Sequence, residues 1–158
     1  MLFRSVRRKV DVPIAADESI RRAADPYRVR DLEAADVAVL KVQPLGGVRA
    51  CLRIAEDIGL PCVVSSALET SVGMAAGIAL AAALPELPYA CGLGTVSMFT
   101  EDIAATALLP DGGVLPVLPT SPAPARLLAE PALSASPGRT EFWRRRLADV
   151  LAYRETLR

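Results

Sequence analysis

The stretch Asp36-Val-Ala-Val-Leu-Lys-Val42, followed by Leu60-Pro-Cys-Val-Val-Ser-Ser66, decides the fold. Each is a short apolar run closed by polar residues, which is typical of a strand buried on both faces of a parallel sheet. Two further runs have the same form, Asp11-Val-Pro-Ile-Ala-Ala-Asp17 and Leu87-Pro-Tyr-Ala-Cys-Gly92. The predicted strands therefore end at residues 17, 41, 65 and 92, at intervals of 24, 24 and 27 residues, which fits repeated βα units.

Helical segments are predicted between these strands, at residues 26–34, 47–58 and 70–84. Gly59 and Pro85 follow the second and third segments and are typical signals of a helix end. Strands and helices that alternate with short connections predict a parallel sheet with helices outside it. Four such α/β units fit either a small doubly wound open sheet or half of an eight-stranded barrel.

The chain changes character after about residue 108, where prolines become frequent and leave little room for regular structure. A final helix is predicted with Thr140 as its N-cap. Its apolar residues fall on one face: Trp143, Leu147, Val150, Leu151 and Leu157. We therefore expect two parts, with the βα units in residues 1–108 and a proline-rich tail and amphipathic helix in residues 109–158.

Composition narrows the possible functions. The chain has 158 residues, of which 52% are hydrophobic, and 18 basic residues balance 18 acidic ones. Because there is no histidine, a Ser-His-Asp triad, a Cys-His pair and a His-ligated zinc are excluded. No Lys or Arg lies between Arg53 and Arg126, so nucleic acid is not an expected partner of that segment, since duplex binding needs cations to neutralise phosphates.

Neither a signal peptide nor a membrane span is predicted. The longest uncharged stretch, residues 70–85, has 16 residues, fewer than the roughly 20 that cross a bilayer. The cytoplasm is the expected location. Cys51, Cys62 and Cys91 show no C-x-x-C spacing, and we expect free thiols packed in the core.

The ends of the predicted strands bring polar residues to one edge of the sheet, where folds of this class carry their chemistry. Asp17 can be a ligand of a hard cation, a helix cap together with Ser19, or a turn residue. Lys41 ends a strand that is expected to be buried. Its partly desolvated ammonium can transfer a proton or stabilise developing negative charge, or else it extends along the surface into solvent.

Hydroxyl and glycine residues follow the other two predicted strands. Ser65, Ser66 and the turn that contains Gly92 and Gly94 can offer hydroxyl and backbone N–H donors to the carboxylate of a small-molecule substrate. The Gly-x-Gly pair lacks the third glycine and the following helix of a dinucleotide-binding fingerprint. These residues therefore predict an anion site without a nucleotide cofactor.

Four strings of the sequence resemble the o-succinylbenzoate synthase family of the enolase superfamily. They occur in order and register over roughly residues 10 to 120: Ala16-Asp-Glu-Ser19, Leu40-Lys-Val-Gln-Pro-Leu-Gly-Gly47, Val64-Ser-Ser-Ala-Leu-Glu-Thr-Ser-Val-Gly73 and Ala90-Cys-Gly-Leu-Gly-Thr95. The first string is typical of the whole superfamily, whereas the Ser-Ser-Ala-Leu-Glu-Thr string supports the narrower assignment. The resemblance implies a modified TIM barrel, a (β/α)₈ fold, of which this chain supplies the C-terminal half, strands five to eight.

The resemblance also implies a reaction and roles for residues. The reaction is the Mg²⁺-dependent loss of water from 2-succinyl-6-hydroxy-2,4-cyclohexadiene-1-carboxylate, which gives 2-succinylbenzoate for menaquinone biosynthesis. Asp17 matches the third carboxylate ligand of the Mg²⁺, and Lys41 matches the sixth-strand lysine that faces the substrate. The residues that fall where the family holds the succinyl carboxylate are Ser65, Ser66, Gly92 and Gly94.

Other parts of the family pattern have no counterpart in this sequence: a Lys-x-Lys on the second strand and two further carboxylate ligands. We therefore expect a C-terminal fragment that is inactive alone and whose partner is the missing N-terminal half of the same enzyme. One alternative is racemisation or epimerisation of N-succinylamino acids on the same barrel. Another is a non-catalytic α/β module that binds an anionic small molecule or pairs with another half-barrel.

Overall fold

The computed structural model describes residues 2–104, 106–117 and 137–156. The chain divides into two compact units, Met1–Pro122 and Ala123–Arg158. In the first unit the described residues form a parallel sheet with helices packed beside it, and in the second they form one helix, α6 (Pro137–Glu155). The boundary expected at residue 108 stays a prediction.

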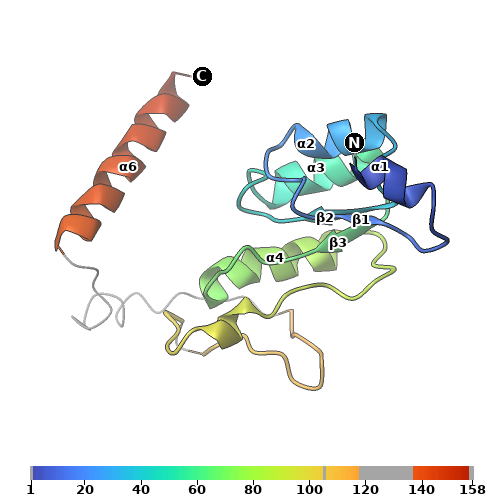
Figure 1. Ribbon diagram of the computed structural model, residues 1–158. Coiled ribbons are helices and arrows are strands. Elements are labelled where there is room, and N and C mark those ends of the chain that lie inside the picture. The colour runs from blue at the N-terminus through green and yellow to red at the C-terminus, as the bar shows by residue number, and fades with distance from the viewer. Residues whose placement is uncertain (1, 105, 118–136, 157–158) are drawn as a thin grey trace. The chain divides into compact units, whose positions relative to one another are not determined.

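Three parallel strands form the sheet in the order in which they occur in the sequence (Figure 1). They are β1 (Ala15–Ala16), β2 (Val37–Leu40) and β3 (Cys62–Val64). The register pairs Ala16 with Ala38 and Leu40 with Val64. All four residues of β2 are buried, as the continuous apolar run predicts for the central strand of a parallel sheet. The first three predicted strand ends are confirmed.

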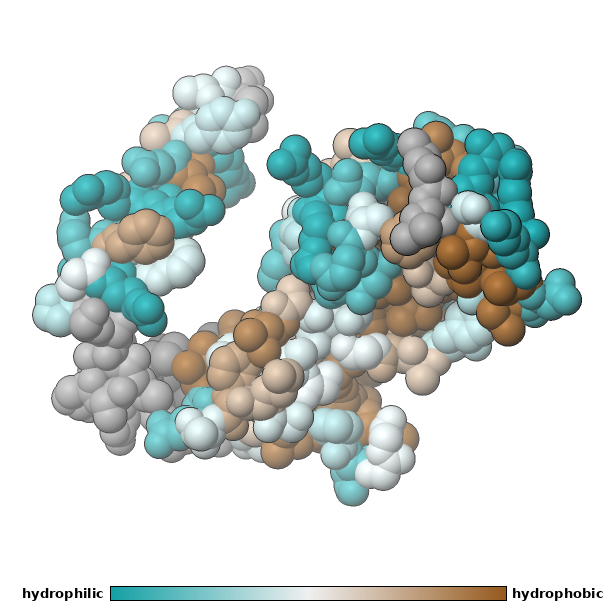
Figure 2. Space-filling model, in the orientation of Figure 1, coloured by the Kyte–Doolittle hydropathy of each residue, from teal (hydrophilic) through white to brown (hydrophobic). Residues whose placement is uncertain are grey.

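Helices follow the strands and pack on one another, α2 against α3 and α3 against α4. The helices described in this unit are α1 (Leu2–Arg7), which precedes β1, α2 (Asp25–Asp31), α3 (Val48–Ile58), α4 (Ser71–Ala83) and a short 3₁₀ helix, η1 (Thr95–Met98). Gly59 ends α3 in the left-handed conformation, with φ 62°, and α4 stops before Pro85, as predicted. Figure 2 shows hydrophilic side chains over α2 and apolar ones over α4, whose sequence is almost entirely small and apolar.

The core lies between the sheet and the helices, and two of the three cysteines belong to it. Cys51 and Cys62 are buried and Cys91 is half-buried, and all three are free thiols, in agreement with the prediction. Burial raises the pKa of the Cys51 thiol and of the Cys62 thiol to about 11 each. Both thiols therefore stay protonated at neutral pH and act as small apolar side chains.

The fourth predicted strand, residues 87–92, forms only one parallel bridge, between Ser65 and Gly92. There the Gly92 N–H donates to the Val64 carbonyl at 2.9 Å, and the Ser66 N–H donates to the Gly92 carbonyl at 3.0 Å. Pro88 has no N–H to offer a ladder, and residues 87–90 are exposed. The predicted strand is therefore in the expected place, beside β3, but is reduced to its last residue.

Two features of the ends of the chain differ from the predictions. The short helix α1 was not predicted; its Arg7 Nε donates to Asp36 Oδ1 at 2.7 Å, next to the start of β2. The described helix α6 spans Pro137–Glu155, so Thr140 lies inside it and is not its N-cap. On its predicted apolar face, the side chain of Trp143 is 57% exposed. Leu157 and segment 118–136 of the proline-rich tail lie outside the described residues.

No helix in the described part of the chain is long and apolar enough to cross a membrane.

Asp102 links the segment after η1 to the first turn of α4 through hydrogen bonds. Its Oδ1 accepts the N–H of Ser71 at 3.1 Å and the N–H of Ile103 at 2.8 Å. The fully buried hydroxyl of Ser71 in turn accepts the N–H of Leu108 at 2.7 Å. Burial raises the pKa of Asp102, but hydrogen bonds from Ser71 and from neighbouring backbone N–H groups outweigh burial, and the net pKa is lowered. The charged carboxylate also suits the positive end of the α4 dipole.

We expect Asp102→Ala to lower the free energy of unfolding by about 1–2 kcal/mol, the usual cost of losing a helix cap. Because the folded pKa lies below the ordinary value of 3.8, the stabilisation by Asp102 is fully present above pH 3.8 and is lost as the pH falls through the folded pKa. Urea unfolding of the chain at several pH values measures both effects. Glu101→Ala, at the exposed neighbouring carboxylate, is the matched control, and an equal loss in both variants would contradict the capping role.

Candidate active site at the carboxyl edge of the sheet

Lys41 brings a buried positive charge to the carboxyl edge of the sheet. It directly follows β2, and its side chain is only 6% exposed, so its ammonium does not extend into solvent. The ammonium Nζ donates a hydrogen bond to Asp17 Oδ1 in a salt bridge, and it lies 4.0 Å from Glu18 Oε1. Parallel pairing of β1 with β2 places both strand ends at this edge, and the carboxylates offset the cost of burying the ammonium.

Asp17 stands at the start of a turn that follows β1. Its carbonyl accepts the N–H of Ile20 at 2.9 Å, and no helix begins between the end of β1 and the start of α2 at Asp25, so the helix-cap interpretation with Ser19 is wrong. Its side chain is 45% exposed, which leaves carboxylate oxygen accessible beside the bond to Lys41. Glu18, which the sequence pattern did not predict as a site residue, pairs with Arg21 and also faces Lys41. An acid adjacent to Asp17 at a strand end was the only available signal.

The donor set at this edge fits one part of a magnesium site. Mg²⁺ prefers carboxylate oxygen, and the half-exposed carboxylate of Asp17 offers it. Within the part of the chain that the structure describes, no group of three His, Cys, Asp or Glu residues could hold a metal ion. Asp17 can therefore contribute one ligand, and a complete site needs further oxygen ligands from a substrate or from other protein segments.

Ser65 and Ser66 follow β3 and face Gly92. The Ser66 hydroxyl donates to the Gly92 carbonyl at 3.1 Å, and the Ser65 hydroxyl lies 3.4 Å from the same oxygen. A Cβ at residue 92 would lie 3.0 Å from Ser65 Oγ, so a side chain there would require the Ser65 hydroxyl to shift. The two serines and Gly92, which the sequence analysis placed at one edge, are thus in direct contact.

Fewer hydrogen-bond donors of Ser65, Ser66 and Gly92 remain for a ligand than the sequence predicts. The backbone N–H groups of Ser65, Ser66 and Gly92 all donate within the sheet, to Leu40, Gly92 and Val64 respectively. The serine hydroxyls are free to rotate away from the Gly92 carbonyl. Among the donors of these three residues, the two hydroxyls are the ones that can turn to a carboxylate. Gly94 accepts the Ser97 hydroxyl at 2.7 Å, and a Cβ on it would meet no atom within 4 Å, so its backbone borders open space.

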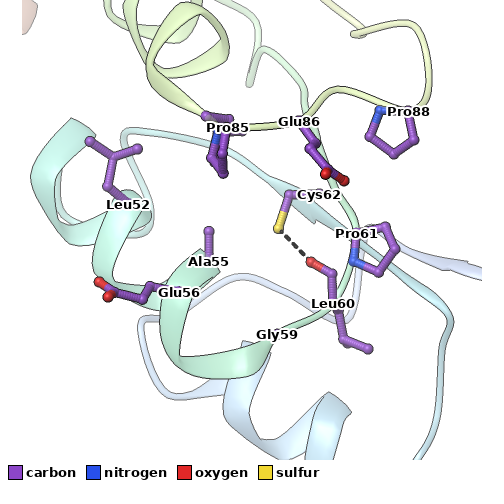
Figure 3. A pocket seen from close by; sticks show the side chains of 11 residues that line it. Leu52, Ala55, Glu56, Gly59, Leu60, Pro61, Cys62, Pro85, Glu86 and Pro88 are labelled. Carbon is purple, nitrogen blue, oxygen red and sulfur yellow. Dashed lines mark hydrogen bonds between the residues drawn. The ribbon is translucent and has the colours of Figure 1, made fainter.

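Two of the cavities beside these elements bear on the site, and one of the two borders predicted site residues. The cavity in Figure 3, of about 580 Å³, lies where β3 begins, and Cys62 and Pro61 line it together with Pro85 from the end of α4. None of the predicted site residues lines it. A second cavity, of about 680 Å³, is lined by Gly92 and Gly94 and by apolar residues of α4 and of segment 110–117. Of the predicted site residues, Gly92 and Gly94 border the second cavity, whereas Lys41, Asp17 and the two serines do not line it.

The pair of Lys41 and Asp17 gives a test of this geometry. Breaking a fully buried ion pair costs about 3–5 kcal/mol, and the exposure of Asp17 reduces that cost, so Asp17→Asn is expected to lower the free energy of unfolding by about 1–2 kcal/mol. Lys41→Met should cost less, because an apolar side chain of similar length suits a buried strand end.

Urea unfolding of both single variants and the double variant measures the coupling. Glu18→Gln is the control and should change stability little, since Glu18 lies 4.0 Å from the ammonium and is exposed. The assigned geometry is wrong if Lys41→Met is as destabilising as Asp17→Asn.

The family described as "Enolase C-terminal domain-like" matches residues 2–122. Curated relatives are named o-succinylbenzoate synthase. The relative from Thermobifida fusca is 75% identical over 112 residues, and that from Mycobacterium bovis is 59% identical over 138 residues. These alignments cover 71% and 87% of this chain but 35% and 41% of the relatives, so the chain spans well under half the length of the relatives it matches.

The solved structures with similar folds include enzymes that are named for different reactions. Muconate lactonizing enzyme from Pseudomonas fluorescens, complexed with muconolactone, is 30% identical with a TM-score of 0.70, covering 80% of this chain and 36% of its own. N-succinyl Arg/Lys racemase from Bacillus cereus is 28% identical with a TM-score of 0.62, covering 76% of this chain and 32% of its own.

Proposed function

This chain belongs to the enolase C-terminal domain-like family, and from its 75% and 59% identity to relatives named o-succinylbenzoate synthase we propose that the whole protein containing it has that activity. The fold predicted from the sequence is confirmed: an α/β chain with a parallel sheet that covers the C-terminal half of an enolase-superfamily barrel. The proposed reaction is loss of water from 2-succinyl-6-hydroxy-2,4-cyclohexadiene-1-carboxylate. The observation that carries the proposal is the identity to these relatives, and the buried Lys41 ammonium, paired with Asp17 at the carboxyl edge of the sheet, is a group that the reaction can use.

The chemistry of the reaction explains why a buried cation is useful there. Removing a proton next to a carboxylate builds negative charge that is high in energy in water. Bound Mg²⁺ would supply Lewis-acid stabilisation of that charge. Lys41 would add a positive charge whose effect is large because its surroundings exclude water. Asp17 would hold the ammonium in place through Oδ1 and offer carboxylate oxygen to the metal.

The serine hydroxyls have a separate proposed role. Ser65 and Ser66 would rotate from the Gly92 carbonyl to donate to the succinyl carboxylate of the substrate, beside the open backbone of Gly94. The proton-abstracting base and the other metal ligands would lie in parts of the whole protein outside these 158 residues. The greater length of the curated relatives supports this division, and a cytoplasmic location stays a prediction.

A second candidate is racemisation of N-succinylamino acids. The observation in its favour is the similarity to the N-succinyl Arg/Lys racemase. Both substrates carry a succinyl carboxylate, and both reactions begin with removal of a proton next to a carboxylate. In the racemase reaction Lys41 would exchange a proton with one face of the α-carbon.

The test is a chimera in which the 112 residues of this chain that align with the Thermobifida fusca relative replace the matching segment of that relative, which the 75% identity makes feasible. We expect the chimera to dehydrate the cyclohexadiene substrate, to lose activity with a chelator and to regain it with Mg²⁺. Lys41→Ala should lower kcat by at least about 10²- to 10³-fold, as the loss of a charge-stabilising group does.

Arg49→Ala, at an exposed position of α3, is the control for the Lys41 variant and should leave activity unchanged. The same chimera is assayed in parallel with N-succinylamino acids. A folded chimera that racemises these but does not dehydrate would favour the second candidate, and one without either activity would remove the enzymatic proposal.

A further inference from the structure

The hydroxyl of Thr95 joins the two segments that carry the proposed carboxylate-binding residues. Thr95 follows the Gly92–Gly94 turn, and Glu69 lies in the loop after Ser66. Thr95 Oγ1 accepts the N–H of Glu69 at 3.0 Å and donates to the carbonyl of Glu69 at 3.3 Å. One hydroxyl therefore holds both backbone groups of Glu69, and we refer to this pair as the Glu69–Thr95 clasp.

The side chain of Glu69 extends the clasp toward the serines. Its Oε1 accepts the N–H of Ala67 at 2.6 Å, and Ala67 directly follows Ser66. The carboxylate lies against the first turn of α4, where a Cβ at residue 73 would be 2.8 Å from the Glu69 Cβ and 3.1 Å from its Oε2. Gly73 thus leaves the space that Glu69 occupies, and the loop, the turn and the helix meet at this one residue.

The backbone between these bonds is in a conformation that needs support. Leu68 lies between Ala67 and Glu69 with φ 75°, a left-handed conformation that is uncommon for a residue with a branched side chain. Its side chain is 58% exposed, so burial of that side chain does not supply the stabilisation. Such conformations persist where neighbouring interactions hold them, and hydrogen bonds on both sides of Leu68 do so here.

We infer that Glu69 and Thr95 are positioning residues for the substrate carboxylate, an inference that rests on the proposed function. Neither residue needs to touch the substrate. Ser65 and Ser66 must turn from the Gly92 carbonyl to the ligand, so the spacing between their loop and the Gly92–Gly94 turn sets whether both hydroxyls reach it. The clasp fixes that spacing. Lys41 and Asp17 lie outside it, so the clasp should act on substrate binding more than on the chemical step.

Thr95→Val removes both hydrogen bonds while nearly preserving volume. In the chimera we expect this variant to raise KM for the cyclohexadiene substrate about tenfold with kcat within about twofold, because the displaced serines weaken binding without changing the lysine. The dissociation constant for 2-succinylbenzoate, titrated by calorimetry, should rise by a similar factor. Thr95→Ser keeps the hydroxyl and should restore both values. Thr100→Val, at an exposed threonine of the same segment, is the matched control.

Glu69→Ala is a second variant, and Glu69→Gln keeps an acceptor for the Ala67 N–H. We expect Glu69→Ala to raise KM, Glu69→Gln to do so less, and the double variant with Thr95→Val to be less than additive, since both act through one clasp. Circular dichroism confirms that each variant folds, and if Thr95→Val does not, the Glu69 pair decides.

Unchanged KM and product affinity in an active, folded Thr95→Val chimera would overturn the inference while leaving the proposed function in place. So would a fall in kcat alone, which would indicate an effect on the chemical step. A parent chimera that neither dehydrates the substrate nor binds 2-succinylbenzoate would overturn the proposed function and, with it, the inference.

Discussion

The salt bridge between Lys41 and Asp17 is the interaction on which the carboxyl edge depends. An ammonium that is almost fully buried is tolerated only when a carboxylate meets it, and Asp17 does so from the neighbouring strand. That meeting requires β1 and β2 to be parallel and in the observed register, which pairs Ala16 with Ala38. The apolar run of β2 therefore has two effects. It forms the centre of the sheet, and it places the Lys41 ammonium at the carboxyl edge of the sheet.

Beyond this pair, the edge is held by hydrogen bonds between segments that are distant in sequence. Gly92 adds its single bridge to β3, and the clasp of Glu69 and Thr95 joins the following turn to the loop after Ser66. Asp102 then fastens the next segment to the N-terminus of α4. Among the described residues after β3, residues 87–90 form no ladder of hydrogen bonds with β3, since Pro88 has no N–H and its neighbours are exposed. Separate hydrogen bonds of Gly92, Thr95 and Asp102 hold this part of the chain in place.

The sequence pattern predicted the strand and helix ends, which depend on hydrophobic period and local backbone geometry. It did not predict contacts between segments that are distant in sequence. The ends of β1, β2 and β3 follow from apolar runs 24 residues apart, and Gly59 and Pro85 mark helix ends by local backbone geometry. The fourth run has the same composition but pairs with β3 only at Gly92, so composition alone overestimated its length. Glu69 and Thr95 are 26 residues apart, and no spacing rule connects them; only the close approach of two loops does.

The two candidate reactions help to separate the roles of these groups. Both begin with loss of a proton next to a carboxylate, so a buried cation and a carboxylate that can hold a metal serve either one. Lys41 and Asp17 therefore bear on whether such chemistry occurs and do not by themselves select a substrate. Selection falls to the groups that hold the rest of the molecule, and in this chain the groups proposed for that role are the hydroxyls of Ser65 and Ser66. Since their loop is set by Glu69 and Thr95, differences in substrate preference between proteins with this edge are expected to arise from the loop rather than from the lysine.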